Sequence, residues 1–118
     1  MNLADAIAKH VEWRTKFRTA IRKKEKVDVA TLRSDGRCGL GKWLQGEGQT
    51  AFRGVPEYAA VQQHHAQFHR VAARVGDAIN AGNYAEAEKM LANGTEYALA
   101  SMEVAKAIVA LQAKTAQP

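Results

Sequence analysis

Two histidines four residues apart, His65 and His69, are the clearest candidates for chemistry in this sequence. In a helix, residues at positions i and i+4 project in directions that differ by only about 40°. Two imidazoles placed in this way can bind one metal ion from adjacent turns. His64 points roughly 100° away from His65 by the same geometry, so we expect it on a flank of the helix.

His10 and Cys38 are further candidates for metal ligands. His10 falls between Ile7 and Trp13 on an apolar helical stripe. Cys38 precedes a glycine-flanked turn, where the backbone can approach a metal closely. Three imidazoles and one thiolate supply four nitrogen and sulfur ligands, which matches the tetrahedral preference of zinc. The same set argues against calcium and magnesium, which prefer oxygen.

Each of these residues also has an ordinary structural interpretation. A histidine on an apolar stripe, such as His10, is more often a satisfied core or interface residue than a ligand. A lone cysteine is more often a small buried hydrophobe, and a histidine pair at i and i+4 is common by chance. The candidates gain weight together, because three of the four histidines and the only cysteine fall where a helical bundle could bring them together.

Helices are the elements predicted to position these residues. Apolar residues at three- and four-residue steps predict helices over about residues 3–25, 56–79, 84–91 and 97–114. A tight turn after Ser34 leads into a short helix around Trp43, and the segment 46–55 is predicted to be a loop. No alternating strand pattern competes with this periodicity. We therefore expect one domain over residues 1–118, an all-α antiparallel four-helix bundle with a short extra helix carrying the cysteine motif.

Side chains suited to helix ends support these boundaries. Asn2 and Asp28 are predicted N-caps, the second of a short turn through Leu32. Gly82 is a plausible residue beyond a helix C-terminus. Asn83 and Glu86 resemble a capping box that opens the helix after it.

Length and composition place the chain among small soluble domains. Of its 118 residues 47% are hydrophobic, which excludes a disordered tail. One cysteine excludes an intramolecular disulfide, so an oxidising compartment is not needed. No apolar run approaches the roughly 20 residues of a membrane span, and the first residues do not form a signal peptide. We expect a cytoplasmic protein that makes no contact with a membrane.

The positive charge gathers in the first part of the chain. The net charge is +5, and basic residues are dense between Arg14 and Lys26. Such a cluster can bind phosphates. However, no aromatic residues interleave with the run from Arg22 to Lys26 to stack bases, so we interpret it as a solvated helix face and expect no nucleic acid partner.

Three motifs in order along the chain resemble the chemoreceptor zinc-binding domain family, known as CZB. They are a histidine followed closely by an aromatic residue (His10 to Trp13), a Cys-x-hydrophobic-Gly-x-aromatic motif (Cys38 to Trp43) and a His-x-x-x-His motif (His65 to His69). The similarity extends from about Asp5 to Leu111, and His64 is extra to the pattern.

The resemblance implies a helical bundle with one zinc ion held by His10, Cys38, His65 and His69. It also implies a regulatory role, because such domains are usually attached to chemoreceptors or diguanylate cyclases and many act as homodimers. In these proteins zinc occupancy, or oxidation of the metal-bound cysteine, alters the output. This chain has no room for a receptor signalling helix or a cyclase domain, so it is either a free-standing member or a fragment.

We expect no enzymatic activity. A zinc with four protein ligands has no open position for a substrate, and Ala66 stands where a zinc protease needs a general-base glutamate. The hypothesis for regulation is that oxidation of Cys38 to sulfenic acid weakens its hold on zinc, frees the glycine-rich turn and shifts helix packing. The alternative is a helical interaction module in which zinc is purely structural. A structural zinc should survive mild chelation, whereas a sensory zinc should exchange.

Overall fold

The computed structural model describes residues 2–34 and 39–115, and this part of the chain is helical throughout, with no strand. Three long helices, each of 20 residues or more, dominate the fold. Four short helices complete it. In chain order the seven are α1 (Leu3–Lys23), α2 (Val29–Arg33), α3 (Gly39–Gln45), α4 (Glu47–Phe52), α5 (Pro56–Asn80), α6 (Tyr84–Met90) and α7 (Glu96–Thr115).

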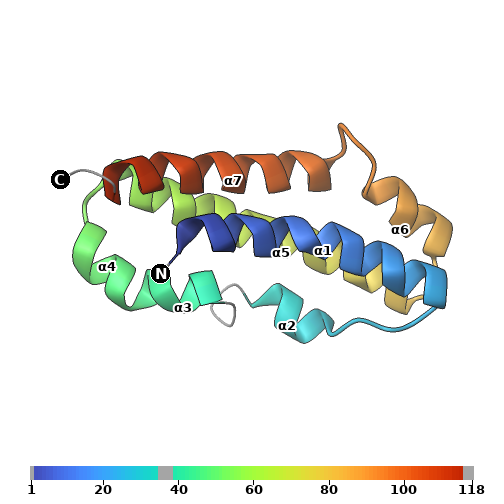
Figure 1. The fold of residues 1–118 in the computed structure, drawn as a ribbon. Coiled ribbons are helices and arrows are strands. Elements are labelled where there is room, and N and C mark those ends of the chain that lie inside the picture. The colour runs from blue at the N-terminus through green and yellow to red at the C-terminus, as the bar shows by residue number, and fades with distance from the viewer. Residues whose placement is uncertain (1, 35–38, 116–118) are drawn as a thin grey trace.

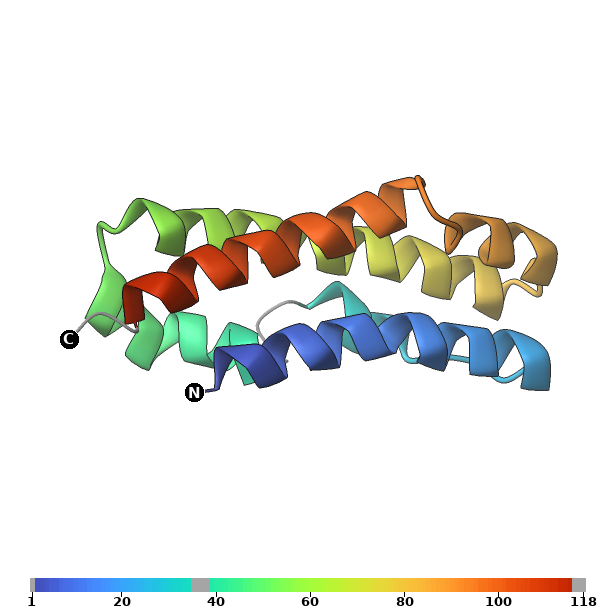
Figure 2. The same cartoon turned by 45° about the horizontal axis from the view of Figure 1, so that its top comes forward.

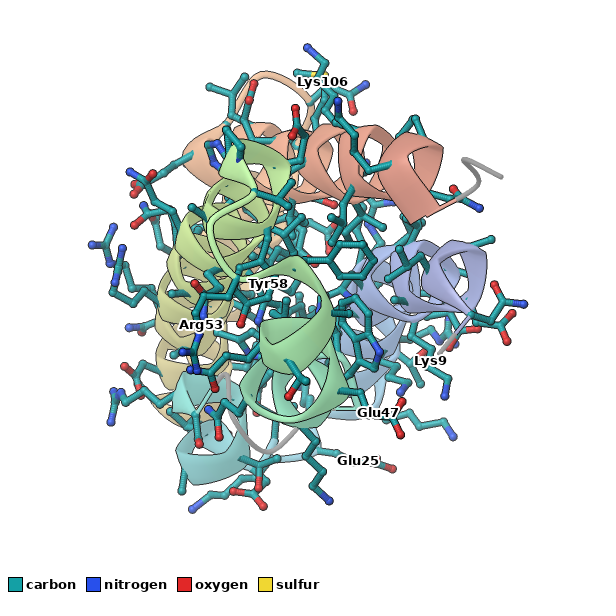
Figure 3. All side chains as sticks on the ribbon, turned by 90° about the vertical axis from the view of Figure 1, so that its left-hand side faces the viewer. Lys9, Glu25, Glu47, Arg53, Tyr58 and Lys106 are labelled. Atoms are coloured by element: carbon teal, nitrogen blue, oxygen red, sulfur yellow. The ribbon has the colours of Figure 1, made fainter. Side chains whose placement is uncertain are left out.

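The helices form four antiparallel columns (Figures 1 and 2). α1 and α5 run in one direction, while α7 and the line of short helices α2, α3 and α4 run in the other. α5 packs against α7 and α2, and α1 packs against α7 and α3. The end-on view of Figure 3 shows these columns around a common core. The predicted all-α antiparallel four-helix bundle is therefore confirmed.

The composition of one column differs from the prediction. The helix expected over residues 84–91 was counted among the four main helices, but α6 is a seven-residue helix at one end of the bundle. The column between α1 and α5 in chain order is built instead from α2, α3 and α4. Each of these short helices buries only a few apolar side chains, such as Leu32 in α2 and Leu40 in α3. Together they cover the side of the core that one long helix would otherwise cover.

The prediction of a loop over residues 46–55 is wrong, because α4 occupies Glu47–Phe52. Gly48 is needed there for packing rather than for a chain break. A Cβ atom at Gly48 would lie 2.8 Å from the Trp43 ring, so only glycine allows α4 to fold back against α3. Tyr58 then ties α5 to this corner, since its hydroxyl donates a hydrogen bond to the Leu44 carbonyl (Figure 3).

The helix ends agree with most of the predicted caps. Asn2 Oδ1 accepts the Asp5 amide at 3.1 Å, and Asp28 Oδ1 accepts the Thr31 amide at 3.1 Å. Gly82 has a φ of 80°, the left-handed conformation expected beyond a helix C-terminus. Asn83 makes no side-chain cap hydrogen bond, so the predicted capping box is wrong. None of the helices in the described part of the chain combines the length and the apolar character that a bilayer crossing requires.

Candidate metal centre

The structure brings three histidines together in the core of the bundle. His10 comes from α1, and His65 and His69 come from successive turns of α5. One ring nitrogen of each lies within 4.8 Å of the others, and the Nε2 atoms of His65 and His69 are 3.0 Å apart. All three side chains are buried, with exposed fractions of 5%, 0% and 3% in chain order. The i and i+4 geometry therefore points both imidazoles of α5 at His10.

Backbone carbonyls orient two of the three rings. His10 Nδ1 lies 2.6 Å from the Ala6 carbonyl oxygen, one turn earlier in α1. His69 Nδ1 lies 2.9 Å from the Leu32 carbonyl oxygen of α2. A carbonyl oxygen can only accept, so each Nδ1 carries the hydrogen and donates it. The Nε2 lone pair of each neutral ring is left to face the cluster, which is how metal-binding histidines are usually held.

Burial favours the neutral form of two of the three rings. It lowers the pKa of His65 from 6.5 to about 3, with smaller contributions in the same direction from His69 and His10. Burial also lowers the pKa of His10, although the bond to the Ala6 carbonyl opposes the shift. Neutral imidazoles are the form that binds a metal, because the ligating nitrogen must be free of its proton. The core therefore favours the neutral, metal-binding form of His10 and His65.

The donor set fits zinc. Zn–N bonds of about 2.0–2.1 Å in a tetrahedron put neighbouring ligand nitrogens roughly 3.3 Å apart. The 3.0 Å between the Nε2 atoms of His65 and His69 is close to this spacing. Three imidazoles from two helices also leave one tetrahedral position for a further ligand. A cluster without carboxylates suits zinc better than magnesium or calcium.

Cys38, the fourth predicted ligand, lies outside the described residues. Its neighbour in sequence, Gly39, is described and begins α3. Gly39 and Leu40 line a cavity of about 230 Å³ together with Ala6 and His10 of α1. The start of α3 therefore lies beside the face of α1 that carries His10.

His64 lies apart from the cluster, as predicted. It is half-buried and lines a separate groove with Gln67 of α5 and Glu103 of α7. The three-histidine group contains His10, His65 and His69 but not His64. His64 is consequently a natural control for experiments on the other histidines.

Sequence reasoning missed the contacts that position α2 against the cluster. A Cβ atom at Gly76 would lie 3.0 Å from side-chain atoms of Leu32 and Val29, so the absence of a side chain lets α2 approach α5 closely. Asn80 continues the contact, donating to the Val27 carbonyl at 2.9 Å and accepting the Val27 amide at 2.8 Å. Gly76 follows His69 by two helical turns. A glycine inside so long a helix is a sequence signal of close packing, and it could have pointed to this contact.

We expect Gly76→Ala to lower the affinity for zinc. The added Cβ would crowd the side chains of Leu32 and Val29. We expect α2 to shift in response, which moves the Leu32 carbonyl away from His69 and costs about 1–3 kcal/mol of stability. Competition with a chromophoric chelator measures the zinc affinity, and urea unfolding measures the stability.

Leu111→Ala is the matched control, because it empties part of the core in α7 rather than at α2. It should destabilise the fold by about 2–5 kcal/mol and leave zinc affinity near the wild-type value. Equal zinc affinity in Gly76→Ala and wild type would contradict the positioning role of Gly76.

The metal-free protein should lose stability on acidification. Unfolded histidines bind a proton below a pKa of 6.5, whereas folded His65 does so only near 3. The unfolded state therefore binds more protons in this window, so the free energy of unfolding falls as pH falls through it. Urea unfolding with chelator present, compared between about pH 7 and about pH 5, avoids most carboxylate titration. A flat profile, or one that rises toward acid, would show that these rings are not buried in the neutral form.

The sequence of this chain matches a known family of domains. The family model described as the chemoreceptor zinc-binding domain matches residues 10–75. The match covers more than half of the chain and spans His10, Cys38, His65 and His69. No curated protein and no solved structure matches the chain significantly. By the family match, this chain belongs to the chemoreceptor zinc-binding domain (CZB) family.

Proposed function

We propose that this chain is a zinc-responsive regulatory domain in which His10, Cys38, His65 and His69 bind one zinc ion. The observation that carries the proposal is the buried group of three histidines, with ligating nitrogens within 4.8 Å of one another. Membership of the CZB family supports zinc as the metal. Bound zinc would cross-link α1, α5 and the cysteine segment and would hold Cys38 as a thiolate.

Backbone carbonyls and burial favour zinc binding by the histidines. The carbonyls of Ala6 and Leu32 fix the orientation of His10 and His69. Burial lowers the pKa of His10 and of His65, which favours their neutral form. With Cys38 as fourth ligand, zinc would have no open position for a substrate, so we propose a site without catalytic activity. In agreement with this, Ala66 follows His65, where a metalloprotease would carry its general base.

Regulation through Cys38 is the second part of the proposal. A peroxide would oxidise the thiolate to sulfenic acid, with cleavage of the O–O bond and release of hydroxide, and sulfenic acid is a poorer ligand. The segment that precedes α3 would then lose its link to α1 and α5. Since α3 contacts α1, this loss would alter the packing of two neighbouring columns. The family suggests the output: a homodimeric, cytoplasmic module that reports to a chemoreceptor or a diguanylate cyclase.

A purely structural zinc is the second candidate. It is favoured by the depth of the site, because His65 has no exposed surface and His69 is 3% exposed. A metal held this far from solvent exchanges slowly unless the bundle opens. In this case the chain would act as a helical interaction module and the ion as a permanent cross-link.

Metal analysis of the purified protein tests the ligand set. We expect one zinc per chain, and we expect Cys38→Ala and His65→Ala each to weaken zinc binding by at least tenfold, because each removes a direct ligand. His64→Ala is the matched control and should bind zinc as the wild type does. Wild-type affinity in Cys38→Ala would remove Cys38 from the ligand set, and a comparable loss in His64→Ala would refute the assignment on α5.

Oxidant titration separates the sensory site from the structural one. We expect hydrogen peroxide to release zinc in proportion to sulfenic acid formed at Cys38, with a parallel change in helicity by circular dichroism. Zinc release is followed with a chromophoric chelator, and dithiothreitol should restore binding. Full retention of zinc by a protein whose Cys38 is oxidised would exclude the switch and leave the structural role.

A further inference from the structure

A groove of about 470 Å³ runs between α1 and α7, away from the residues of the metal centre. Its size is within the range of small-molecule sites, roughly 300–1,000 Å³. Three large hydrophobic side chains line it and remain about half exposed: Val11 at 54%, Leu99 at 49% and Met102 at 44%. Arg14 and Tyr97 line the same groove.

Two of the residues that line this groove carry a buried hydrogen-bond donor with no partner among the described residues. The donors are the Nε of Arg14 and the hydroxyl of Tyr97. Tyr97 is only 2% exposed, and burial raises its pKa while the charge of Arg14 acts in the opposite direction. The phenol therefore stays protonated, near the guanidinium. Buried donors without acceptors are unfavourable, so an acceptor that reached both would be bound strongly.

Among the described residues, the charge of Arg14 also has no counter-ion. Its Nη2 donates to the Leu91 carbonyl and to Asn93 Oδ1 at 3.1 Å, and both of these acceptors are neutral. In the described part of the chain the ion pairs are Arg18–Glu88, Arg33–Asp77 and Arg74–Glu96, none of which includes Arg14. A partly buried cation of this kind favours an anionic acceptor over a neutral one.

We propose that the groove between α1 and α7 binds a small organic monocarboxylate with a short apolar chain. The carboxylate accepts hydrogen bonds from Arg14 Nε and the Tyr97 hydroxyl, and the apolar chain lies against Val11, Leu99 and Met102. One cation and two donors suit the single charge and two oxygens of a carboxylate. Because the donors lie below the surface, the carboxylate inserts between the two helices rather than resting on their rims.

The site is distinct from the metal centre but shares helix α1 with it. Val11 follows His10 directly in sequence. The ring of Phe68 lies 5.2 Å from that of His10 and 5.7 Å from that of Tyr97, so one side chain contacts both regions. A carboxylate could also coordinate zinc directly. The binding experiment must therefore locate the ligand and be run with and without zinc.

Titration with sodium hexanoate, followed by NMR of side-chain methyl groups, tests the proposal. We expect saturable shifts of the Met102, Leu99 and Val11 methyls in both the zinc-loaded and the zinc-free protein. Hexanol, which has the same apolar chain without the charge, should bind at least tenfold more weakly. Equal affinity for hexanol, shifts that require zinc, or the absence of saturable shifts at these methyls would overturn the proposal.

Tyr97→Phe separates binding from stability. It removes a hydroxyl that has no partner in the described part of the chain, so the melting temperature should stay the same or rise. The hexanoate affinity should fall about tenfold, the equivalent of one hydrogen bond to a charged group. Tyr84→Phe, in α6, is the matched control and should leave hexanoate affinity unchanged. A Tyr97→Phe protein that melts lower and binds hexanoate like wild type would show that the hydroxyl is satisfied within the fold, and the proposal would fail.

Discussion

Three imidazoles buried side by side are the feature on which the rest of this structure depends. A buried ring nitrogen needs a hydrogen-bond partner or a metal, because its desolvation is otherwise uncompensated. The bundle meets this need for His10 within α1, through the Ala6 carbonyl, and for His69 through the Leu32 carbonyl of α2. The positions of α1, α2 and α5 are therefore linked by the polar groups of one cluster.

This constraint gives a physical reason for the broken second column. A continuous helix would use its own carbonyls in internal hydrogen bonds, whereas α2 ends at Arg33 and leaves the Leu32 carbonyl available to His69. Glycines allow the short pieces to pack closely: Gly76 admits α2 against α5, and Gly48 admits α4 against Trp43. The helices of this column are short, and the end of α2 lets a backbone carbonyl reach the core.

Helix α1 joins two regions of different chemistry. One turn presents His10 to the cluster in the core, and the next presents Arg14 to the groove against α7. Phe68 packs against His10 and against Tyr97, so aromatic contacts run from one region to the other. A change in the position of α1 would consequently alter both the histidine cluster and the groove. If ligands bind at both, each changes the affinity for the other by the same factor.

The sequence by itself determined the helical class, the long helices and the shared direction of His65 and His69, because each depends on periodicity within one segment. The cap at Asn2 was equally local, while α4 was missed because glycines that serve packing look like chain breaks. The meeting of His10 with the α5 pair was expected from the family resemblance, and the tertiary structure confirmed it. Only the tertiary structure decided that Leu32 orients His69 across 37 positions in sequence, and that Arg14 and Tyr97 share a groove. Such contacts depend on how separate helices pack, and no spacing along one segment encodes that.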